Sequence, residues 1–198
     1  MRETGRVSAP VPSQSLRERK KLRTRLAIRR EAFRLFDEQG YTNTTVEQIA
    51  EAAEVSPRTF YRYFGVKERL LLSDDKISPI VEAFIAAPTE LSIVAAYRHA
   101  VATVFGHLSQ EERDDVLAGE QFMYAIPEAR GLIYTEYVRL IDLIADALTE
   151  RPEGPDDEME RRVIAGAIVG VLIAASHNNP FPEEALAKSL EILEHRLN

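Results

Sequence analysis

Residues 44–67 constrain the fold more than any other stretch, because they predict two short helices joined by a tight turn. Thr45 precedes apolar residues at helical spacing, and Gln48 follows three positions later, which is the pattern of a capping box. Ser56 and Pro57 then favour the start of a second helix, since Ser caps free amides and Pro needs no amide partner there. The sequence therefore predicts a helix-turn-helix.

The second helix, which is expected to end near Phe64, leaves polar and basic side chains on its outer face. Arg side chains bond guanine edges in the major groove, whereas Thr and Tyr hydroxyls bond phosphates. This pattern predicts binding to double-stranded DNA, although two ordinary core helices are the alternative interpretation. The candidate DNA-binding residues are Thr45, Ser56, Pro57, Arg58, Thr59, Tyr61, Arg62, Tyr63 and Lys67.

The run T-T-V-E-Q-I-A, the later run F-Y-R-Y-F and Lys67 resemble the DNA-binding domain of the TetR family of bacterial transcriptional regulators. The resemblance covers residues 22–70, and it implies that Lys67 lies near a DNA phosphate at the start of a helix. One position departs from the family pattern, because the turn residue that is often Gly is Glu54 here. A left-handed conformation costs a residue other than Gly about 1 kcal/mol.

Charge is divided along the chain, although the whole sequence has a formal net charge of −7. Residues 1–70 carry 15 Lys and Arg against 9 Asp and Glu, whereas residues 71–198 carry 10 against 23. The basic first third suits a polyanion such as DNA, and we expect the acidic remainder to point away from it.

The sequence divides into three parts. Residues 1–15 hold two prolines, three serines and few apolar groups, which predicts a disordered basic arm. Residues 16–66 are expected to form a three-helix, helix-turn-helix domain, whose first helix begins near Ser15 and ends at Gly40. Residues 67–198 are expected to form a helical bundle for ligand binding and dimerisation.

The bundle is expected to open with a helix from Lys67 to about Asp75, after which Pro79 breaks it or begins a segment ending near Ala87. No segment has the period of a strand, so the predicted fold class is all-α. Further helices are predicted over residues 90–108, 109–124, 127–148, 158–177 and 182–197, the first of them capped by Pro88 and Thr89.

The penultimate helix is apolar nearly all round, as the run RRVIAGAIVGVLIAAS shows, so it must be buried on several sides. In the TetR family the last two helices meet their copies in a second subunit, which implies a homodimer. The alternative is that both helices only complete the core of one subunit. We favour the homodimer, because a two-fold protein suits a palindromic operator.

The segment IPEARGLIYTEYVRLIDLIADALTER resembles a subgroup of this family with an acyl-CoA-like ligand-binding C-terminal domain, of the mycofactocin-regulator type. This implies an apolar tunnel for a small hydrophobic or acyl-CoA-like effector, with Arg130 or Arg139 near an anionic group. Each aromatic residue of the region has the alternative of only filling the core. The candidate ligand-binding residues are Tyr97, Phe122, Met123, Tyr134 and Tyr137.

Several other function classes are disfavoured. The chain has no Cys, which excludes disulfides and thiol catalysis, and its four His residues have no metal-site spacing, so we expect no metal and no cofactor. No apolar run is long enough to span a membrane, and a cytoplasmic location is expected. The preferred interpretation is a ligand-responsive repressor and not an enzyme. The alternatives are an architectural or activating DNA-binding protein without a ligand, and an all-helical enzyme.

Overall fold

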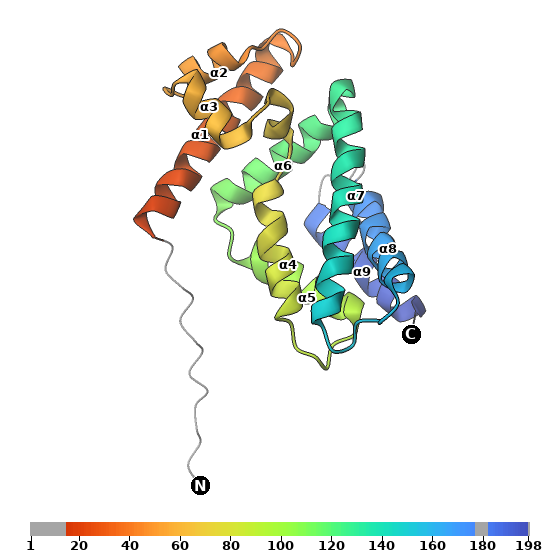
Figure 1. The fold of residues 1–198 in the computed structure, drawn as a ribbon. Coiled ribbons are helices and arrows are strands. Elements are labelled where there is room, and N and C mark those ends of the chain that lie inside the picture. Colours follow the sequence, from red (N-terminus) through yellow and green to blue (C-terminus); the bar gives the residue numbers. More distant parts are fainter. Residues whose placement is uncertain (1–14, 177–181, 198) are drawn as a thin grey trace.

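The computed structural model describes residues 15–176 and 182–197 (Figure 1). Within these residues the backbone forms nine α-helices and four short 3-10 helices, with no strand, so the predicted all-α class is confirmed. The predicted arm, apart from Ser15, and the predicted helix end at His177 lie outside the described residues. No helix in the described part of the chain combines the length and the apolar character needed to cross a membrane.

The N-terminal helices lie together at the top of Figure 1, and α6 runs between them and the remaining helices. The N-terminal helices are α1 (Leu16–Gln39), α2 (Val46–Ala52) and α3 (Pro57–Phe64). The C-terminal helices are α4 (Ile77–Ile85), α5 (Ile93–Gly106), α6 (Gln110–Ala125), α7 (Arg130–Ala147), α8 (Glu158–Ser176) and α9 (Pro182–Leu197). The 3-10 helices are η1 (Lys67–Leu71), η2 (Asp74–Lys76), η3 (Pro127–Ala129) and η4 (Leu148–Glu150).

The predicted helix starts in the N-terminal domain are confirmed. The Thr45 hydroxyl accepts the Gln48 amide, and the Gln48 side chain accepts the Thr45 amide at 2.9 Å, which completes a capping box on α2. The Ser56 hydroxyl accepts the Thr59 amide at 3.1 Å and caps α3, with Pro57 at its first position. Both helices are short, so these bonds supply much of their local definition.

The turn between α2 and α3 is a Schellman motif built around Glu54. Glu54 has a φ of 54°, the left-handed conformation that the sequence placed at this position. The Val55 amide donates to the Ala50 carbonyl at 2.8 Å, and the Glu54 amide donates to the Glu51 carbonyl at 3.0 Å. The turn therefore keeps its standard hydrogen bonds, with a strain of about 1 kcal/mol at the Glu side chain.

The upper core joins the N-terminal helices to the C-terminal half of the chain. Phe33 and Phe36 of α1 pack around Phe122 of α6, and the Phe33 and Phe122 rings stack at 5.0 Å. Ile126 and Ala129, which follow α6, are buried in the same cluster as Phe60 and Phe64. The end of α6 is therefore part of the core against which α3 packs.

The lower core lies among α4, α5, α7, α8 and α9. Its fully buried side chains include Phe84, Ile144, Leu148, Ile168 and Leu190. Arg151 is buried against Phe84 of this core, and its guanidinium donates hydrogen bonds to the carbonyls of Phe84, Ala87 and Pro88. Those bonds tie the loop after α7 to the connection between α4 and α5.

Two predicted helix boundaries are wrong. Residues 67–75 do not form one α-helix, because η1 stops at Leu71 and α4 begins only at Ile77. The reason is Arg29, whose guanidinium donates hydrogen bonds to the Leu70 and Leu72 carbonyls at 2.5 Å each. In a continuing α-helix these carbonyls would instead accept hydrogen bonds from backbone amides of the next turn. Pro79 accordingly sits in the first turn of α4, where Pro is tolerated.

The second wrong boundary is the start of α5, which begins at Ile93 and not at residue 90. Its cap is Ser92, whose hydroxyl accepts the Ala95 amide at 3.2 Å, in place of the predicted pair Pro88 and Thr89. The Pro88 carbonyl is bound by Arg151, which holds this residue in the preceding turn.

Gly119 of α6 has no side chain because the Arg29 guanidinium occupies that space. An added Cβ would lie closer than 3.0 Å to the Arg29 Nη2 and 3.4 Å from the Leu71 carbonyl oxygen. The guanidinium is held by the Leu70 and Leu72 carbonyls and, through Nη2, by the Asp115 carbonyl, so it has little freedom to move away.

Gly119→Ala is expected to lower the free energy of unfolding by about 1–3 kcal/mol through overpacking, despite the better helix propensity of Ala. Gly131→Ala is the matched control on α7, where an added Cβ would meet nothing within 4 Å. It should be neutral or slightly stabilising. Chemical denaturation of both variants measures the difference, and equal stabilities would contradict this packing.

Candidate DNA interface and effector region

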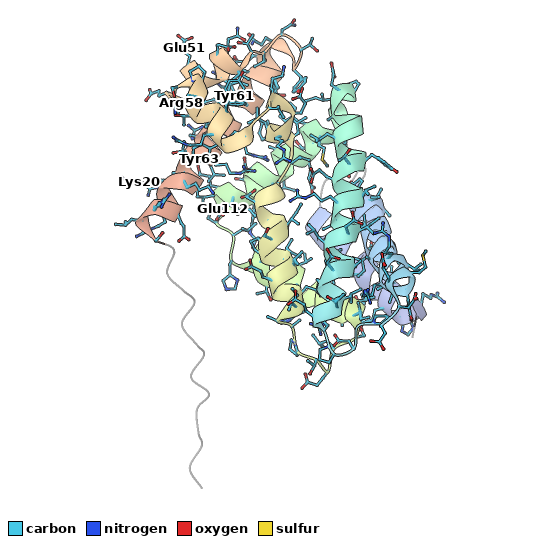
Figure 2. The ribbon with its side chains drawn as sticks, viewed as in Figure 1. Lys20, Glu51, Arg58, Tyr61, Tyr63 and Glu112 are labelled. Atoms are coloured by element: carbon cyan, nitrogen blue, oxygen red, sulfur yellow. The ribbon has the colours of Figure 1, made fainter. Side chains whose placement is uncertain are left out.

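The outer face of α3 presents the side chains that the sequence assigned to base and phosphate contacts. Arg58 and Arg62 are exposed, and Tyr61 is about half exposed at 49%. In Figure 2, Arg58 and Tyr63 of α3 and Lys20 of α1 all lie on the side away from α7, α8 and α9. On the opposite face of α3, Phe60 and Phe64 are buried in the upper core, so this helix has a fixed orientation on the domain.

The hydroxyl residues near the helix starts are engaged in local bonds. The Ser56 and Thr59 hydroxyls lie 3.0 Å apart, and Thr59 is partly buried. Thr45 is exposed while it caps α2, and Pro57 is exposed at the first position of α3. These residues form the exposed N-termini of α2 and α3. A helix N-terminus attracts phosphate through its free backbone amides.

The Lys67 side chain points back into the N-terminal domain. Its Nζ donates to the Tyr41 and Thr44 carbonyls at 2.9 Å each, and it lies 3.9 Å from the centre of the Tyr41 ring. Partial burial lowers its pKa, against the attraction of Glu68 and Glu128. Lys67 therefore holds the connection between α1 and α2 in place, and a phosphate contact by its remaining donor stays a prediction.

The start of α1 continues the basic surface. Lys20, Lys21 and Arg23 are exposed, as phosphate contact requires. Arg25 is different, since it pairs with Asp75 at 3.1 Å and lies over the Phe64 ring at 4.9 Å. It joins α1 to the segment before α4.

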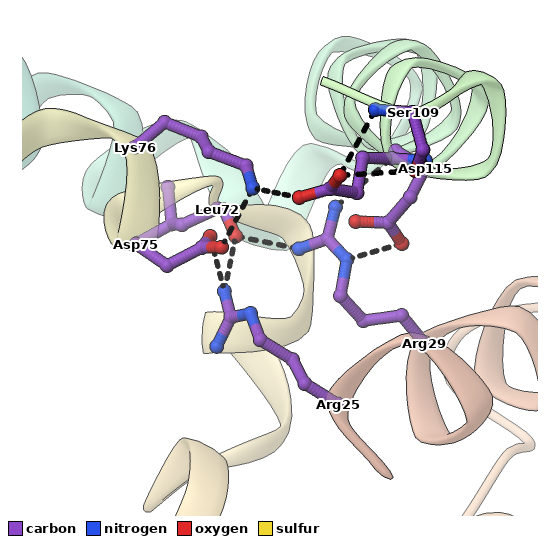
Figure 3. Close-up of polar contacts among 8 residues, drawn as sticks. Arg25, Arg29, Leu72, Asp75, Lys76, Ser109 and Asp115 are labelled. Carbon is purple, nitrogen blue, oxygen red and sulfur yellow. Dashed lines mark hydrogen bonds and ion pairs between the residues drawn. The ribbon is translucent and has the colours of Figure 1, made fainter. Parts of the chain in front are cut away.

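Arg29 is the most deeply buried charged side chain of the junction between the two halves (Figure 3). Its Nε lies 2.7 Å from the Asp115 carboxylate of α6, and its Nη2 donates to the Asp115 carbonyl at 3.1 Å. With the bonds to Leu70 and Leu72, one guanidinium from α1 binds both α6 and the segment before α4. Arg29 is not among the residues predicted to be functional, because no nearby residue in the sequence signals its distant partners.

A second ion pair lies beside Arg29. Lys76 Nζ is 3.0 Å from a Glu112 carboxylate oxygen, and the other oxygen accepts the Ser109 amide at 3.0 Å (Figure 3). Burial raises the pKa of Asp115 above its usual value, against the attraction of Arg29. The junction is therefore a connected polar cluster in which α6 contacts both α1 and the start of α4.

A cleft of about 660 Å³ opens next to this cluster, between α1 and the end of α5. Glu18, Asp75, Lys76 and Glu112 supply charged groups to its wall. Such a wall does not suit the acyl chain of the predicted effector, because ligand sites for apolar molecules are lined mainly by apolar side chains.

The five predicted ligand-binding residues lie in different surroundings. Tyr97 is buried in the lower core against Phe84, with ring centres 5.7 Å apart. Phe122 and Met123 pack on the upper core, whereas Tyr134 is 72% exposed. The structure does not bring these four side chains around one space, and their role as one pocket wall stays a prediction.

Tyr137 is part of a polar cluster between α6 and α7 that the sequence analysis did not identify. Its hydroxyl lies 2.6 Å from the Tyr124 hydroxyl, and Glu120 stands one helical turn before Tyr124 on α6. Burial raises the pKa of Glu120 to about 7. Burial also raises the pKa values of both tyrosines, and the charge of Glu120 adds to this effect. The spacing of Glu120 and Tyr124 was the available sequence signal.

Two family models match the chain. Residues 28–73 match the model described as bacterial regulatory proteins of the tetR family, and residues 91–197 match the model described as the MftR C-terminal domain. Together they include the helix-turn-helix and all helices from α5 to α9.

Individual relatives agree with these matches. The HTH-type transcriptional regulator TcmR of Streptomyces glaucescens is 43% identical over 129 residues, which are 63% of this chain and 56% of the relative. The HTH-type transcriptional repressor NicS of Pseudomonas putida is 29% identical over 171 residues, 85% of this chain and 66% of the relative. The matches thus span less than two thirds of the length of either relative.

The solved structure of the TetR family repressor AlkX from Dietzia sp. has the same fold. It aligns with a TM-score of 0.51 and 22% identity, over 87% of this chain and 94% of that one.

The raised pKa of Glu120 predicts how stability depends on pH. Protonation is favoured in the folded state, so stability is expected to fall as pH rises from about 4.5 through about 7. Glu120→Gln cannot ionise and should therefore gain stability over the wild type at pH 8, by roughly 1–2 kcal/mol after allowance for the exposed part of the side chain. The gain should shrink towards pH 5. Denaturation at both pH values measures it.

The control is Glu111→Gln at the exposed start of the same helix. Its difference from the wild type should change little between the two pH values. A Glu120→Gln difference that is equally independent of pH would contradict the assignment.

Proposed function

Because the chain belongs to the TetR family of bacterial regulatory proteins, we propose that it is a homodimeric, ligand-responsive repressor of transcription. It binds a palindromic operator through α3 and leaves it when a small hydrophobic molecule occupies the C-terminal helices. It acts in the cytoplasm, where its operator lies.

The DNA-binding part of the proposal rests on α3, which would be the recognition helix. Its apolar face is buried, its start is capped by Ser56, and its outer face leaves Arg58 and Arg62 exposed. The exposed basic residues at the start of α1 extend this surface and would contact the DNA backbone. A rigid helix with exposed arginines suits the major groove.

Release requires that the effector prefers a conformation in which the two recognition helices no longer match the operator. The Arg29–Asp115 pair supports such coupling, since it connects α6 directly to α1. If an effector displaced α6, this buried ion pair would either break or move with the helix. Because breaking a buried ion pair costs several kcal/mol, movement of both partners together is favoured. A displacement of α6 would therefore also displace α1, and α3 with it.

The effector we propose is small and hydrophobic, with an acyl-CoA-like molecule as the candidate that the C-terminal family suggests. Arg139, one of the two residues considered for an anionic group, is exposed and lies 3.1 Å from Glu136. It would have to leave this partner to bind an anion. The side chain of Arg130 lies outside the described residues.

The homodimer is supported by an apolar stripe on α8 that the single chain leaves uncovered. Met159 and Val163 are 67% and 63% exposed, and Ile173 is 38% exposed further along the helix. Gly170 is also exposed, with open space around it. Ile192 of α9 is 54% exposed. A second copy of the same helix pair would cover these residues.

The first prediction concerns operator recognition. A palindromic duplex selected from random sequences should bind with a steep dependence on salt. Arg58→Ala should cost about 1–3 kcal/mol and relax the base preference, whereas Tyr61→Ala should weaken all sequences alike. Mobility-shift titrations against the selected duplex and single-base variants of it measure both effects.

Arg139→Ala removes the same charge far from α3 and serves as the control. It should leave operator affinity nearly unchanged. If Arg58→Ala and Tyr61→Ala behave like this control, α3 is not the recognition helix.

The second prediction concerns the dimer. Gly170→Arg adds a long charged side chain where the fold of one subunit has room for it, so the subunit should stay folded. In a dimer the same charge would be buried without a partner, at a cost of several kcal/mol. Sedimentation at micromolar concentration is expected to show a dimer for the wild type and a monomer for the variant.

Gly131→Arg on α7 is the matched control, since an added Cβ there also meets nothing within 4 Å. It should remain dimeric. A wild-type protein that sediments as a monomer would end the dimer proposal.

A further inference from the structure

The turn before α3 carries a carboxylate that the fold does not require. In the part of the chain that the structure describes, Glu54 is the only residue other than Gly with a positive φ, at 54°. Gly adopts this conformation without steric cost, whereas Glu is strained in it. Strained residues gather at functional sites, where a particular side chain is needed. Turn geometry alone therefore does not account for the Glu side chain.

The Glu54 side chain is available for a contact outside the subunit. It is exposed, and it forms no hydrogen bond and no ion pair with the residues that the structure describes. The turn itself is held by backbone hydrogen bonds, such as that from the Glu54 amide to the Glu51 carbonyl at 3.0 Å. The carboxylate thus adds no described bond between α2 and α3.

The turn lies at the end of α3 that would approach the bases. In a helix-turn-helix, the N-terminal residues of the recognition helix contact base edges in the major groove. Glu54 precedes Ser56, the N-cap of α3, by two positions. Figure 2 labels Glu51 of α2 and Arg58 of α3 on either side of this turn, and both lie on the side away from α7, α8 and α9. Glu54 is therefore placed beside the base-reading surface.

Few other polar side chains are available at this end of α3. The Ser56 hydroxyl accepts the Thr59 amide at 3.1 Å and lies 3.0 Å from the Thr59 hydroxyl, and Pro57 has no polar side chain. Arg58 and Glu54 remain, both exposed and without a hydrogen bond or ion pair to the described residues. Arg only donates and suits the O6 and N7 acceptors of guanine, whereas a carboxylate only accepts and suits the N4 amino group of cytosine.

We propose that Glu54 is a specificity-determining residue, which accepts a hydrogen bond from the N4 amino group of a cytosine next to the guanine read by Arg58. The inference rests on the proposed function, since it requires α3 to be the recognition helix. A carboxylate discriminates in two ways. It bonds the correct base, and it is repelled by phosphates and by the acceptor edges of guanine and thymine. Glu54 would thus weaken binding to wrong sequences as well as strengthen binding to the right one.

Glu54→Gly tests this role, because Gly removes the carboxylate and suits the conformation of the turn. Each base pair of the duplex that the wild type selects from random sequences is varied singly in mobility-shift titrations with the full chain. The wild type should prefer cytosine at one position of each half-site by about tenfold. The variant should lose this preference, keep those at the other positions and bind a random duplex more tightly. Its melting temperature should not fall, since the turn loses its strain.

Two further variants separate base readout from charge. Glu54→Gln removes the charge, but its amide both donates and accepts, so the preferred base should shift from cytosine towards adenine. Glu150→Gln removes the same charge from the exposed end of η4, which follows α7, and is the control. It should leave every base preference unchanged.

If Glu54→Gly keeps the base preference of the wild type at every position, the proposal is overturned, even where affinity for all duplexes rises alike. Such a uniform rise would show charge repulsion without readout of a base. Failure of the proposed function gives a different result. A wild type that selects no duplex loses both assignments, whereas selectivity that depends on Arg58 but not on Glu54 removes only this one.

Discussion

The structure depends on one buried guanidinium. Arg29 of α1 has no exposed surface, and it binds the Asp115 carboxylate, the Asp115 carbonyl and the carbonyls of Leu70 and Leu72. An Arg cannot lose its charge in a protein, so its burial is possible only with this full set of acceptors. Meeting that requirement ends η1, excludes a side chain at Gly119 and fixes α6 against α1. The position of the recognition helix relative to the C-terminal helices follows from it.

This junction connects two cores of different character. The upper core takes aromatic rings from α1, α3 and α6, whereas the lower core is formed by α4, α5, α7, α8 and α9. α6 belongs to both sides, because its end packs under α3 while its Tyr124 hydroxyl contacts that of Tyr137 on α7. A molecule bound against α6 would therefore act on a helix that also contacts Arg29. Packed cores respond to such a change by discrete shifts, which is what a switch requires.

The sequence predicted well those features that local chemistry determines. The capping box of Thr45 and Gln48, the Ser56 cap and the left-handed Glu54 all depend on neighbours within a few residues. It failed where distant residues decide the outcome. Arg29 lies 86 positions from Asp115, and its bonds replace the predicted helix at residues 67–75 by η1. The predicted ligand-binding residues are likewise placed by distant packing, which divides them between two cores and the surface, as Tyr134 shows, so their role as one pocket wall stays a prediction.

The central claim is that the Arg29–Asp115 contact transmits the state of α6 to the DNA-binding helices, and a double-mutant cycle on operator affinity tests it most directly. The cycle combines Arg29→Lys with Asp115→Asn, neither of which lies on the outer face of α3. We expect each single change to alter operator affinity and the double variant to be non-additive, with a coupling energy of about 0.5–3 kcal/mol. Single changes without effect, or effects that add within error, would contradict it.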